Sequence, residues 1–555
     1  MKHLNFLLNF WVYAITLFTC VGVVACSGEE EVLSQERIFK LTSTDLDCSS
    51  GSIVKVPYIG KTYLIKIEAS DDVEWSVEGS LGELLLVSPK GIQKGNGQIE
   101  IQARANSDRN EVRTGFVIIR NSLTQSTEAK ISFEQKEKDL FFPEGTEGQT
   151  SAEFTKPTSK YNTYYMEEGV NIAILWDRSL GITPTKFDSK KAIKAADDCF
   201  DFLIDEVGFA NRTTSYANKN KFLIFINKED QGTAYGGGNH KVGMIWLGPN
   251  HLSNSEKVNR YGILYHEMCH CFQAMAGWDG AAPMNGPLNE MTSQWALLRK
   301  FPNWMDLEPY HVTNFMLQSH YAFGHESNGY RAPWLLEYWE NKRGPQFTPR
   351  IWKDAIQSDN SDPVVAYKRL TGLSQEQFND ETFEAYRRFI TWDIPSIKDF
   401  SDKYANKHTC KLTKSNKTYR ITPERCPQNY GYNGIKLQVP ASGTTISLSF
   451  TGFTTGGNEF YIPYPSECGW RYGFVAMTKS GERVYGDMGR GRDGTLSFKV
   501  PENTTNLWLV VMGAPTNHHK HSIDASIENV DKRKYAQWPY QFTLLGAELD
   551  GTMIQ

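Results

Sequence analysis

The motif His266-Glu267-Met268-Cys269-His270 constrains the fold of this chain more than any other feature of the sequence. The pattern around it, from about residue 256 to 276, is helical, and residues four apart on a helix lie on one face. Two imidazoles placed in this way can bind a single metal ion. Glu267 then lies close enough to deprotonate a metal-bound water. The motif therefore predicts a helix that carries a zinc site with Glu267 as the general base. The alternative is a pair of histidines that bind no metal.

A catalytic zinc ion usually has three protein ligands, so a third ligand is expected elsewhere. The best candidate is Glu290, which lies 20 residues after His270 on the next predicted helix. Its alternative role is a solvated carboxylate at a helix N-terminus. A side chain that stabilises the oxyanion is expected further along the chain, and Tyr330 is the first choice, ahead of His320 and His325.

Two cysteines, Cys269 and Cys271, flank His270. Thiolates are good zinc ligands, so a structural Cys/His site is an alternative. Successive side chains on a helix point to different faces, however, and this favours packed thiols. Elsewhere, Cys410 and Cys426 form the pair best placed for a disulfide bond.

The length and charge of the chain exclude some classes of protein. Its 555 residues allow three or four domains at about 150 residues each. A hydrophobic fraction of 40% excludes wholesale disorder. The formal net charge of −5 argues against a nucleic-acid partner, because the binding of phosphates needs a basic surface.

The pattern of the sequence changes three times along the chain. Residues 36–137 show short alternating strands, which predict an immunoglobulin-like β-sandwich. Residues 138–160 are rich in Pro, Gly, Ser and Thr and predict a linker. Residues 161–408 begin with strands and continue with helices, as in an α+β domain. Residues 409–555 return to strands and predict a second β-sandwich or jelly roll.

Within the α+β segment, apolar runs predict strands at 170–176, 222–226 and 244–247. A turn is expected at Gly236-Gly237-Gly238, just before the last of these strands.

The N-terminus resembles that of a bacterial lipoprotein. An apolar stretch ends in small residues before Cys26, as in a lipobox, and an acidic run follows. The resemblance implies a signal peptide over 1–25, an acylated Cys26 and an acidic tether over 26–35. It also implies a lipid-anchored protein on the outer face of the outer membrane. The alternative is an uncleaved transmembrane anchor, since about 20 apolar residues can span a bilayer.

The first sandwich resembles the BACON domain, which is common in surface glycan-processing lipoproteins. The resemblance rests on Trp75-x-Val77, Val87-Ser88-Pro89-x-Gly91, Gly95-Asn96, Asn106, Arg113 and Gln135. It implies either a spacer or a sugar-binding module.

The central segment resembles the gluzincin peptidases, in which HExxH is followed by a glutamate on a second helix. Residues 261–273 are also similar to the basic secretory peptidases of plants and bacteria. Overall, residues 161–545 are most similar to an uncharacterised family of zincin-like exported proteins. Zincins pair an extended substrate with an edge strand above the metal, and residues 244–247 are expected to provide that strand. Where some gluzincins use an acidic partner for a ligand histidine, this chain has Ser293 and Gln294.

Together these features predict a surface-anchored zinc metallopeptidase with a protein or glycoprotein substrate. The ligands of Zn²⁺ are expected to be His266, His270 and Glu290. The alternatives are a glycan-binding protein without turnover and, less directly, a glycan hydrolase. Trp470, Tyr472 and Trp538 would favour glycan binding if they are exposed, but they serve equally well in a sandwich core. The run His518-His519-Lys520-His521 is expected to form an exposed loop rather than a second metal site.

Overall fold

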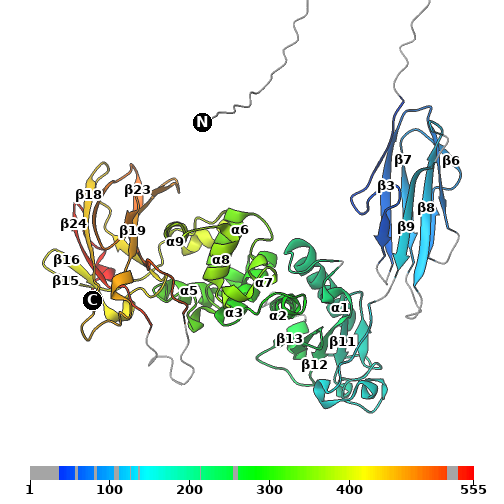
Figure 1. Cartoon of the computed structure of the whole chain (residues 1–555), viewed down its shortest axis with the longest axis horizontal. Coiled ribbons are helices and arrows are strands. Elements are labelled where there is room, and N and C mark those ends of the chain that lie inside the picture. Colours follow the sequence, from blue (N-terminus) through cyan, green and yellow to red (C-terminus); the bar gives the residue numbers. More distant parts are fainter. Residues whose placement is uncertain are drawn as a thin grey trace, which may run out of the picture. The chain divides into compact units, whose positions relative to one another are not determined.

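The computed structural model describes residues 37–555 except 57–59, 81–83, 105–111, 125–126, 136–137, 213, 254–260 and 522–534. The chain divides into two compact units, one that extends to Gln135 and one that contains the chain beyond it. The expected multidomain, sheet-rich organisation with central helices is confirmed (Figure 1). Cys26 and the signal segment lie outside the described residues. Among the described helices, none is long and apolar enough to cross a membrane.

The N-terminal unit consists of two sheets, with strand orders β1-β3-β7-β5 and β2-β9-β8-β4-β6. Side chains along β3 alternate between exposed and buried, as expected when one face of a sheet covers a core. Ile65, Ile99, Ile119 and Ile131 from both sheets meet in this core. The strands are β1 (Phe39–Thr42), β2 (Ile53–Lys55), β3 (Lys61–Ala69), β4 (Glu74–Gly79), β5 (Leu85–Ser88), β6 (Ile92–Lys94), β7 (Gly97–Ala103), β8 (Arg113–Asn121) and β9 (Thr127–Gln135).

The second unit begins with a mixed sheet of order β10-β11-β12-β14-β13. The strands are β10 (Met166–Glu168), β11 (Ile172–Trp176), β12 (Phe222–Ile226), β13 (Tyr235–Asn239) and β14 (Val242–Leu247). The three apolar strands β11, β12 and β14 are parallel and central, and each side chain of β11 and β12 is buried.

The two edges of this sheet are β10 and the glycine-rich β13. The prediction that 244–247 forms the edge strand is therefore wrong, because β13 covers β14. The expected turn at Gly236–Gly238 is a strand instead.

Helices α1 and α2 pack against one face of the sheet, and further helices follow. They are α1 (Ser189–Asp201), α2 (Gly262–Trp278), α3 (Pro287–Lys300), α4 (Trp304–Leu307), α5 (Pro309–Leu317), α6 (Trp334–Arg343), α7 (Arg350–Lys353), α8 (Pro363–Thr371), α9 (Gln375–Ile390) and α10 (Lys398–Ser401).

The opposite face of the sheet is covered by the segment expected to be a linker, residues 138–160. Phe142 and Phe154 stack on one another, and Phe154 packs against Phe225 of β12. Both rings are buried with Leu175 and Leu223 of the sheet. This segment therefore contributes to the core of the second unit.

The chain ends in a sandwich-like pair of sheets, with strand orders β15-β16-β24-β18-β22 and β17-β23-β19-β20, and β21 pairs with β19. The strands are β15 (Leu412–Ser415), β16 (Thr418–Ile421), β17 (Tyr432–Leu437), β18 (Thr445–Gly452), β19 (Trp470–Thr478), β20 (Arg483–Tyr485), β21 (Gly489–Arg490), β22 (Asp493–Lys499), β23 (Thr504–Gly513) and β24 (Tyr540–Leu545). Trp470, Tyr472 and Trp538 are buried in the core between the sheets.

Strand β23 is buried on both faces. Leu507, Leu509 and Val511 point into the core between the two sheets. Trp508 and Val510, which alternate with them, belong to the core of the central helices instead. Strand β23 therefore forms the boundary between the core of the sandwich and the core of the central helices, and contributes to both.

Candidate metal centre

Helices α2 and α3 pack side by side and bring three donor atoms together. Nε2 of His266 lies 3.0 Å from Oε2 of Glu290 and 3.3 Å from Nε2 of His270. Nε2 of His270 lies 3.5 Å from the same Glu290 oxygen. Ligand bonds of about 2.0–2.2 Å at tetrahedral angles separate donor atoms by about 3.3–3.6 Å. The three side chains therefore fit a zinc ion in both chemistry and spacing.

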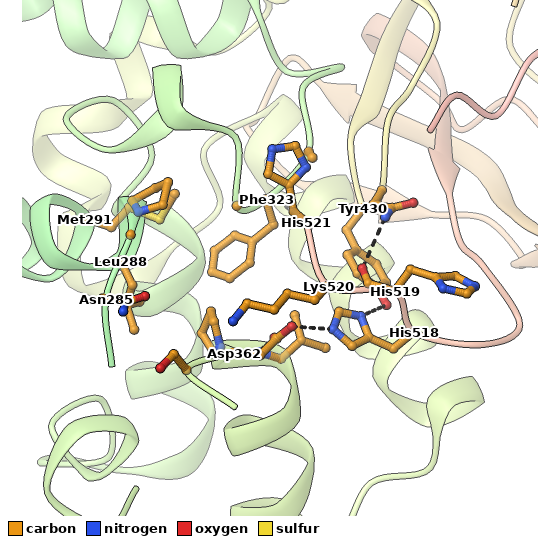
Figure 2. Close-up of a pocket in the computed structure, with 18 residues that line it drawn as sticks. Asn285, Leu288, Met291, Phe323, Asp362, Tyr430, His518, His519, Lys520 and His521 are labelled. Carbon is orange, nitrogen blue, oxygen red and sulfur yellow. Dashed lines mark hydrogen bonds and ion pairs between the residues drawn. The ribbon is translucent and has the colours of Figure 1, made fainter. Parts of the chain in front are cut away.

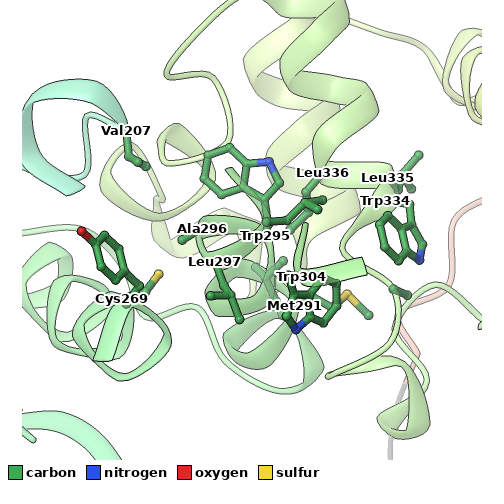
Figure 3. Close-up of a cluster of buried hydrophobic side chains, with 14 of the residues drawn as sticks. Val207, Cys269, Met291, Trp295, Ala296, Leu297, Trp304, Trp334, Leu335 and Leu336 are labelled. Carbon is green, nitrogen blue, oxygen red and sulfur yellow. The ribbon is translucent and has the colours of Figure 1, made fainter. Parts of the chain in front are cut away.

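The position of Glu290 is fixed by the opposite face of α3, which is buried in an aromatic cluster (Figure 3). Trp295 and Met291 of α3 lie with Trp304 and Trp334 in this cluster, and all four side chains are nearly inaccessible to solvent. Burial alone would raise the pKa of Glu290, but hydrogen bonds with the two histidines outweigh it and hold that pKa far below its usual value. Glu290 is thus a carboxylate rather than a carboxylic acid.

Glu267 lies beside the three ligands. Its carboxylate and the ring nitrogens of His266 and His270 lie within 4.8 Å of one another. The side chain is 5% exposed, and this burial raises its pKa, which the neighbouring histidines partly offset. A carboxyl group with a raised pKa is better suited to accept and return a proton near neutral pH than an ordinary glutamate.

The glycine-rich strand β13 lies directly against the motif helix. The backbone N–H of Gly236 donates a hydrogen bond to Glu267. A Cβ atom at Gly236 would lie 2.2 Å from the carbonyl oxygen of Glu267, so only glycine allows this approach. The sequence therefore places glycine where a strand must meet the helix backbone.

Each ligand histidine is oriented by a glutamine. Oε1 of Gln294 lies 3.1 Å from Nδ1 of His266, and Oε1 of Gln273 lies 2.9 Å from Nδ1 of His270. The amide nitrogens of the two glutamines donate to the carbonyl oxygens of Tyr330 and Asn289.

The orientation of these amides sets the tautomer of both histidines. Because each glutamine presents its oxygen to a ring, Nδ1 carries a proton, and loss of the proton that Nε2 shares with Glu290 would free the Nε2 lone pair for a metal. The sequence drew attention to Gln294 but missed Gln273. The available signal was its spacing, since Gln273 follows His270 by three residues on the same helix face.

Tyr330 is the oxyanion candidate that lies against the ligands. Its ring stacks on His266 with the centroids 5.9 Å apart. Partial burial, together with the charge of Glu290 and a hydrogen bond to it, raises the pKa of Tyr330 to about 12, so the phenol keeps its proton. His320 and His325 pack instead against Tyr321, at centroid distances of 4.6 and 4.2 Å.

The flanking cysteines point away from the ligands, as packed thiols do. The thiol of Cys271 contacts the carbonyl oxygen of Met244 at 3.4 Å. Burial raises the pKa of Cys269 to about 12, which disfavours a thiolate. Cys410 and Cys426 are buried free thiols in this structure, so it contains no bond between them.

Comparison with known proteins gives one family match. Residues 132–551 match the model described as "Family of unknown function (DUF6055)". The search of curated proteins returns no match.

The similarities to solved structures are weak. A functionally unknown conserved protein from Bacillus anthracis str. Ames has a TM-score of 0.25 and 11% identity, over 66% of this chain and 76% of that one. A GH5 xyloglucanase from Bacteroides ovatus has a TM-score of 0.15 and 13% identity, over 48% and 62%. A family 22 carbohydrate binding module of Clostridium thermocellum Xyn10B has a TM-score of 0.15 and 13% identity, over 26% and 82%. These scores are too low to support an argument about this chain.

Proposed function

Because the chain belongs to DUF6055, a family of unknown function, we propose its activity from the site itself: zinc-dependent hydrolysis of peptide bonds. The observation that carries the proposal is the convergence of His266, His270 and Glu290 within 3.0–3.5 Å, with the buried Glu267 beside them. A zincin-like fold for the central region, with HExxH on one helix and a glutamate on the next, is part of the same proposal.

His266, His270 and Glu290 would hold the zinc ion. When bound, zinc lowers the pKa of water and polarises a carbonyl group. Glu267 accepts a proton from the attacking water and delivers it to the leaving nitrogen as the peptide bond breaks. The Tyr330 phenol donates a hydrogen bond to the former carbonyl oxygen as negative charge develops on it.

The edge strand β13 supports an extended peptide as the substrate. Strand β13 is the last strand of the sheet and lies against α2. Its outer edge has no neighbour among the described strands. An extended peptide can add to such an edge through main-chain hydrogen bonds. Gly237 leaves the edge sterically open, since a Cβ atom there would meet only the Tyr235 ring, at 4.0 Å.

The proposal extends to the setting of the enzyme. The N-terminal unit serves as an immunoglobulin-like, BACON-type module, either a spacer or a sugar-binding domain. The chain is anchored in the outer membrane through an acylated Cys26 and cleaves surface-accessible proteins or glycoproteins.

The competing proposal is a binding protein without turnover. Two observations weigh against it. The three candidate ligands and the base are all present and correctly arranged. In addition, Trp470, Tyr472 and Trp538, the aromatic side chains considered for glycan binding, are buried.

The test separates the roles of the two glutamates. Glu267→Gln retains the size and hydrogen bonding of the side chain but cannot accept the proton. We expect full zinc content and a fall in the hydrolysis rate of about 10²–10⁴. Glu290→Ala removes a ligand, so zinc affinity itself should fall, with partial recovery of activity in excess zinc.

The measurements are zinc content by elemental analysis and cleavage of casein and a mucin-derived peptide. A wild-type chain that binds no zinc after loading would refute the proposal. A wild-type chain that binds zinc tightly but cleaves nothing in a broad peptide library would favour the binding protein.

A further inference from the structure

A cavity of about 330 Å³ lies where the helical region meets loops of the C-terminal sandwich (Figure 2). Its walls are the start of α3, residues 322–324, the start of α8, and residues 429–430 with 518–521. Small-molecule sites occupy about 300–1,000 Å³, so this cavity accommodates a small ligand. The loop 518–521, expected to be exposed, forms one wall.

The interior of the cavity is apolar. Leu288 and Met291 of α3, Phe323 and Val364 line it, and each is at most 7% exposed. Such a lining favours an aliphatic or aromatic group over a polar one.

The acidic group in the wall, Asp362, already has fixed hydrogen-bond partners within the protein. Oδ2 of Asp362 lies 2.8 Å from Nε2 of His518, and its Oδ1 accepts the backbone N–H of Val364. The other ring nitrogen of His518 is hydrogen-bonded to the Tyr430 hydroxyl at 2.7 Å. Both side chains are therefore held in place by partners within the protein.

Lys520 supplies a positive charge that is not neutralised. Its side chain is directed into the space between Phe323 and Asp362 (Figure 2). Its ammonium group donates to the carbonyl oxygen of Asn360, and among the residues that the structure describes no carboxylate pairs with it.

Helix α3 also begins at this cavity. Gly286 is its N-cap residue and provides no side-chain hydrogen bond, and Glu290 is the acidic residue in its first turn. The positive group at the border of the apolar cavity is therefore the Lys520 ammonium.

From the apolar lining and the charge of Lys520, we propose that this cavity binds a carboxylate on an apolar chain, with the chain inside and the carboxylate on Lys520. The same chemistry is found in a fatty acid and in the C-terminal residue of a peptide. The proposal does not depend on the proposed peptidase activity, because none of His266, Glu267, His270 and Glu290 lines the cavity.

Calorimetric titration of the purified, metal-free chain tests the proposal. The probes are octanoate and N-acetyl-leucine, each compared with its uncharged amide. We expect saturable binding of at least one acid, with its amide weaker by about tenfold. Stronger binding of octanoate indicates the lipid source, and stronger binding of N-acetyl-leucine the peptide source. Failure of both acids to bind, or equal binding of acid and amide, overturns the proposal.

Two variants locate the binding. Lys520→Met removes the charge at an exposed position and should weaken acid binding about tenfold without affecting the amide. Gly324→Leu fills the cavity at a position where a Cβ atom meets only His521, at 3.4 Å, and should abolish binding. Lys499→Met, an exposed lysine on β22, is the matched control.

Acid binding that survives both cavity variants unchanged would place the ligand elsewhere and overturn the assignment. The variant Glu267→Gln should bind the acids as the wild type does, which keeps this result separate from that of the peptidase test.

Discussion

At the scale of single residues, the orientation of the two candidate ligand histidines depends on neutral amides. Gln273 and Gln294 accept hydrogen bonds from the two ligand histidines. An amide oxygen is a weaker hydrogen-bond acceptor than a carboxylate. It therefore increases the basicity of the imidazole less, and each ring would donate its electron pair to a metal less strongly. The histidines are nevertheless fixed in ring plane and tautomer.

Gln294→Ala should lower zinc affinity about 10–100-fold, because the freed His266 ring loses its orientation. Gln294→Glu keeps an acceptor at the same place and should restore most of the affinity. Competition with a chromophoric chelator measures both. If the alanine variant bound zinc as tightly as the wild type, the hydrogen bond would have no role in orienting the ligand.

At the scale of elements, the proximity of the three candidate ligands could be predicted because its geometry is local. His266 and His270 need only a helix, and Glu290 needs only a second helix beside it. The edge strand could not be predicted in the same way. Three consecutive glycines have low strand propensity, but β13 pairs with β14, and its close approach to α2 leaves no room for a side chain at Gly236. This approach is a contact between Gly236 and Glu267, which lie 31 positions apart, and no local sequence pattern predicts it.

The segment 138–160 was missed for a similar reason. Its Pro, Gly and Ser content is typical of a linker, whereas its fold depends on two rings. Phe142 and Phe154 become core residues only because the second face of the sheet is otherwise uncovered by the described helices.

Two of the three glycines of β13 allow a matched test of this contact. Gly236→Ala places a methyl group 2.2 Å from the carbonyl oxygen of Glu267 and forces the strand from the helix. We expect a loss of about 1–3 kcal/mol in the free energy of unfolding, together with weaker zinc binding. Gly237→Ala adds the same methyl group in open space and should leave both quantities nearly unchanged. Chemical denaturation and zinc titration measure the pair. Equal effects of the two variants would contradict this account of β13.

At the scale of the whole molecule, Arg471 of β19 joins the sandwich to helix α9. Its buried guanidinium donates to Asp380 at 2.6 Å and to Glu376 at 2.5 Å. These hydrogen bonds, with those from Arg490, overcome the effect of burial and lower the pKa of Asp380. A lowered folded-state pKa stabilises the fold above the pKa of the unfolded chain, and that stability disappears as the pH falls through the folded-state value.

Arg471→Met should therefore destabilise the second unit by about 1–3 kcal/mol at pH 7, because it removes the buried partner of Asp380. The difference from the wild type should begin to shrink below about pH 4, where the carboxyl group becomes protonated in the unfolded chains, and should disappear as the pH falls through the lower pKa of Asp380 in the folded wild type. Arg490→Met, which removes an exposed partner of the same carboxylate, should cost less than about 1 kcal/mol. Urea denaturation of each variant at pH 7 and pH 3.5 provides the comparison. A difference that grows as the pH falls would contradict this assignment.

The two buried faces of β23 also constrain how such a chain can change over generations. A substitution at Trp508 or Val510 alters the surface on which the helices rest, and one at Leu507 or Leu509 alters the interior of the sandwich. Substitutions in the helical region and in the sandwich must therefore remain compatible with each other. Replacing either region with an unrelated domain would expose an apolar face of β23. A strand shared in this way requires that the helical region and the sandwich are inherited together. The family match spans both regions, from residue 132 to 551.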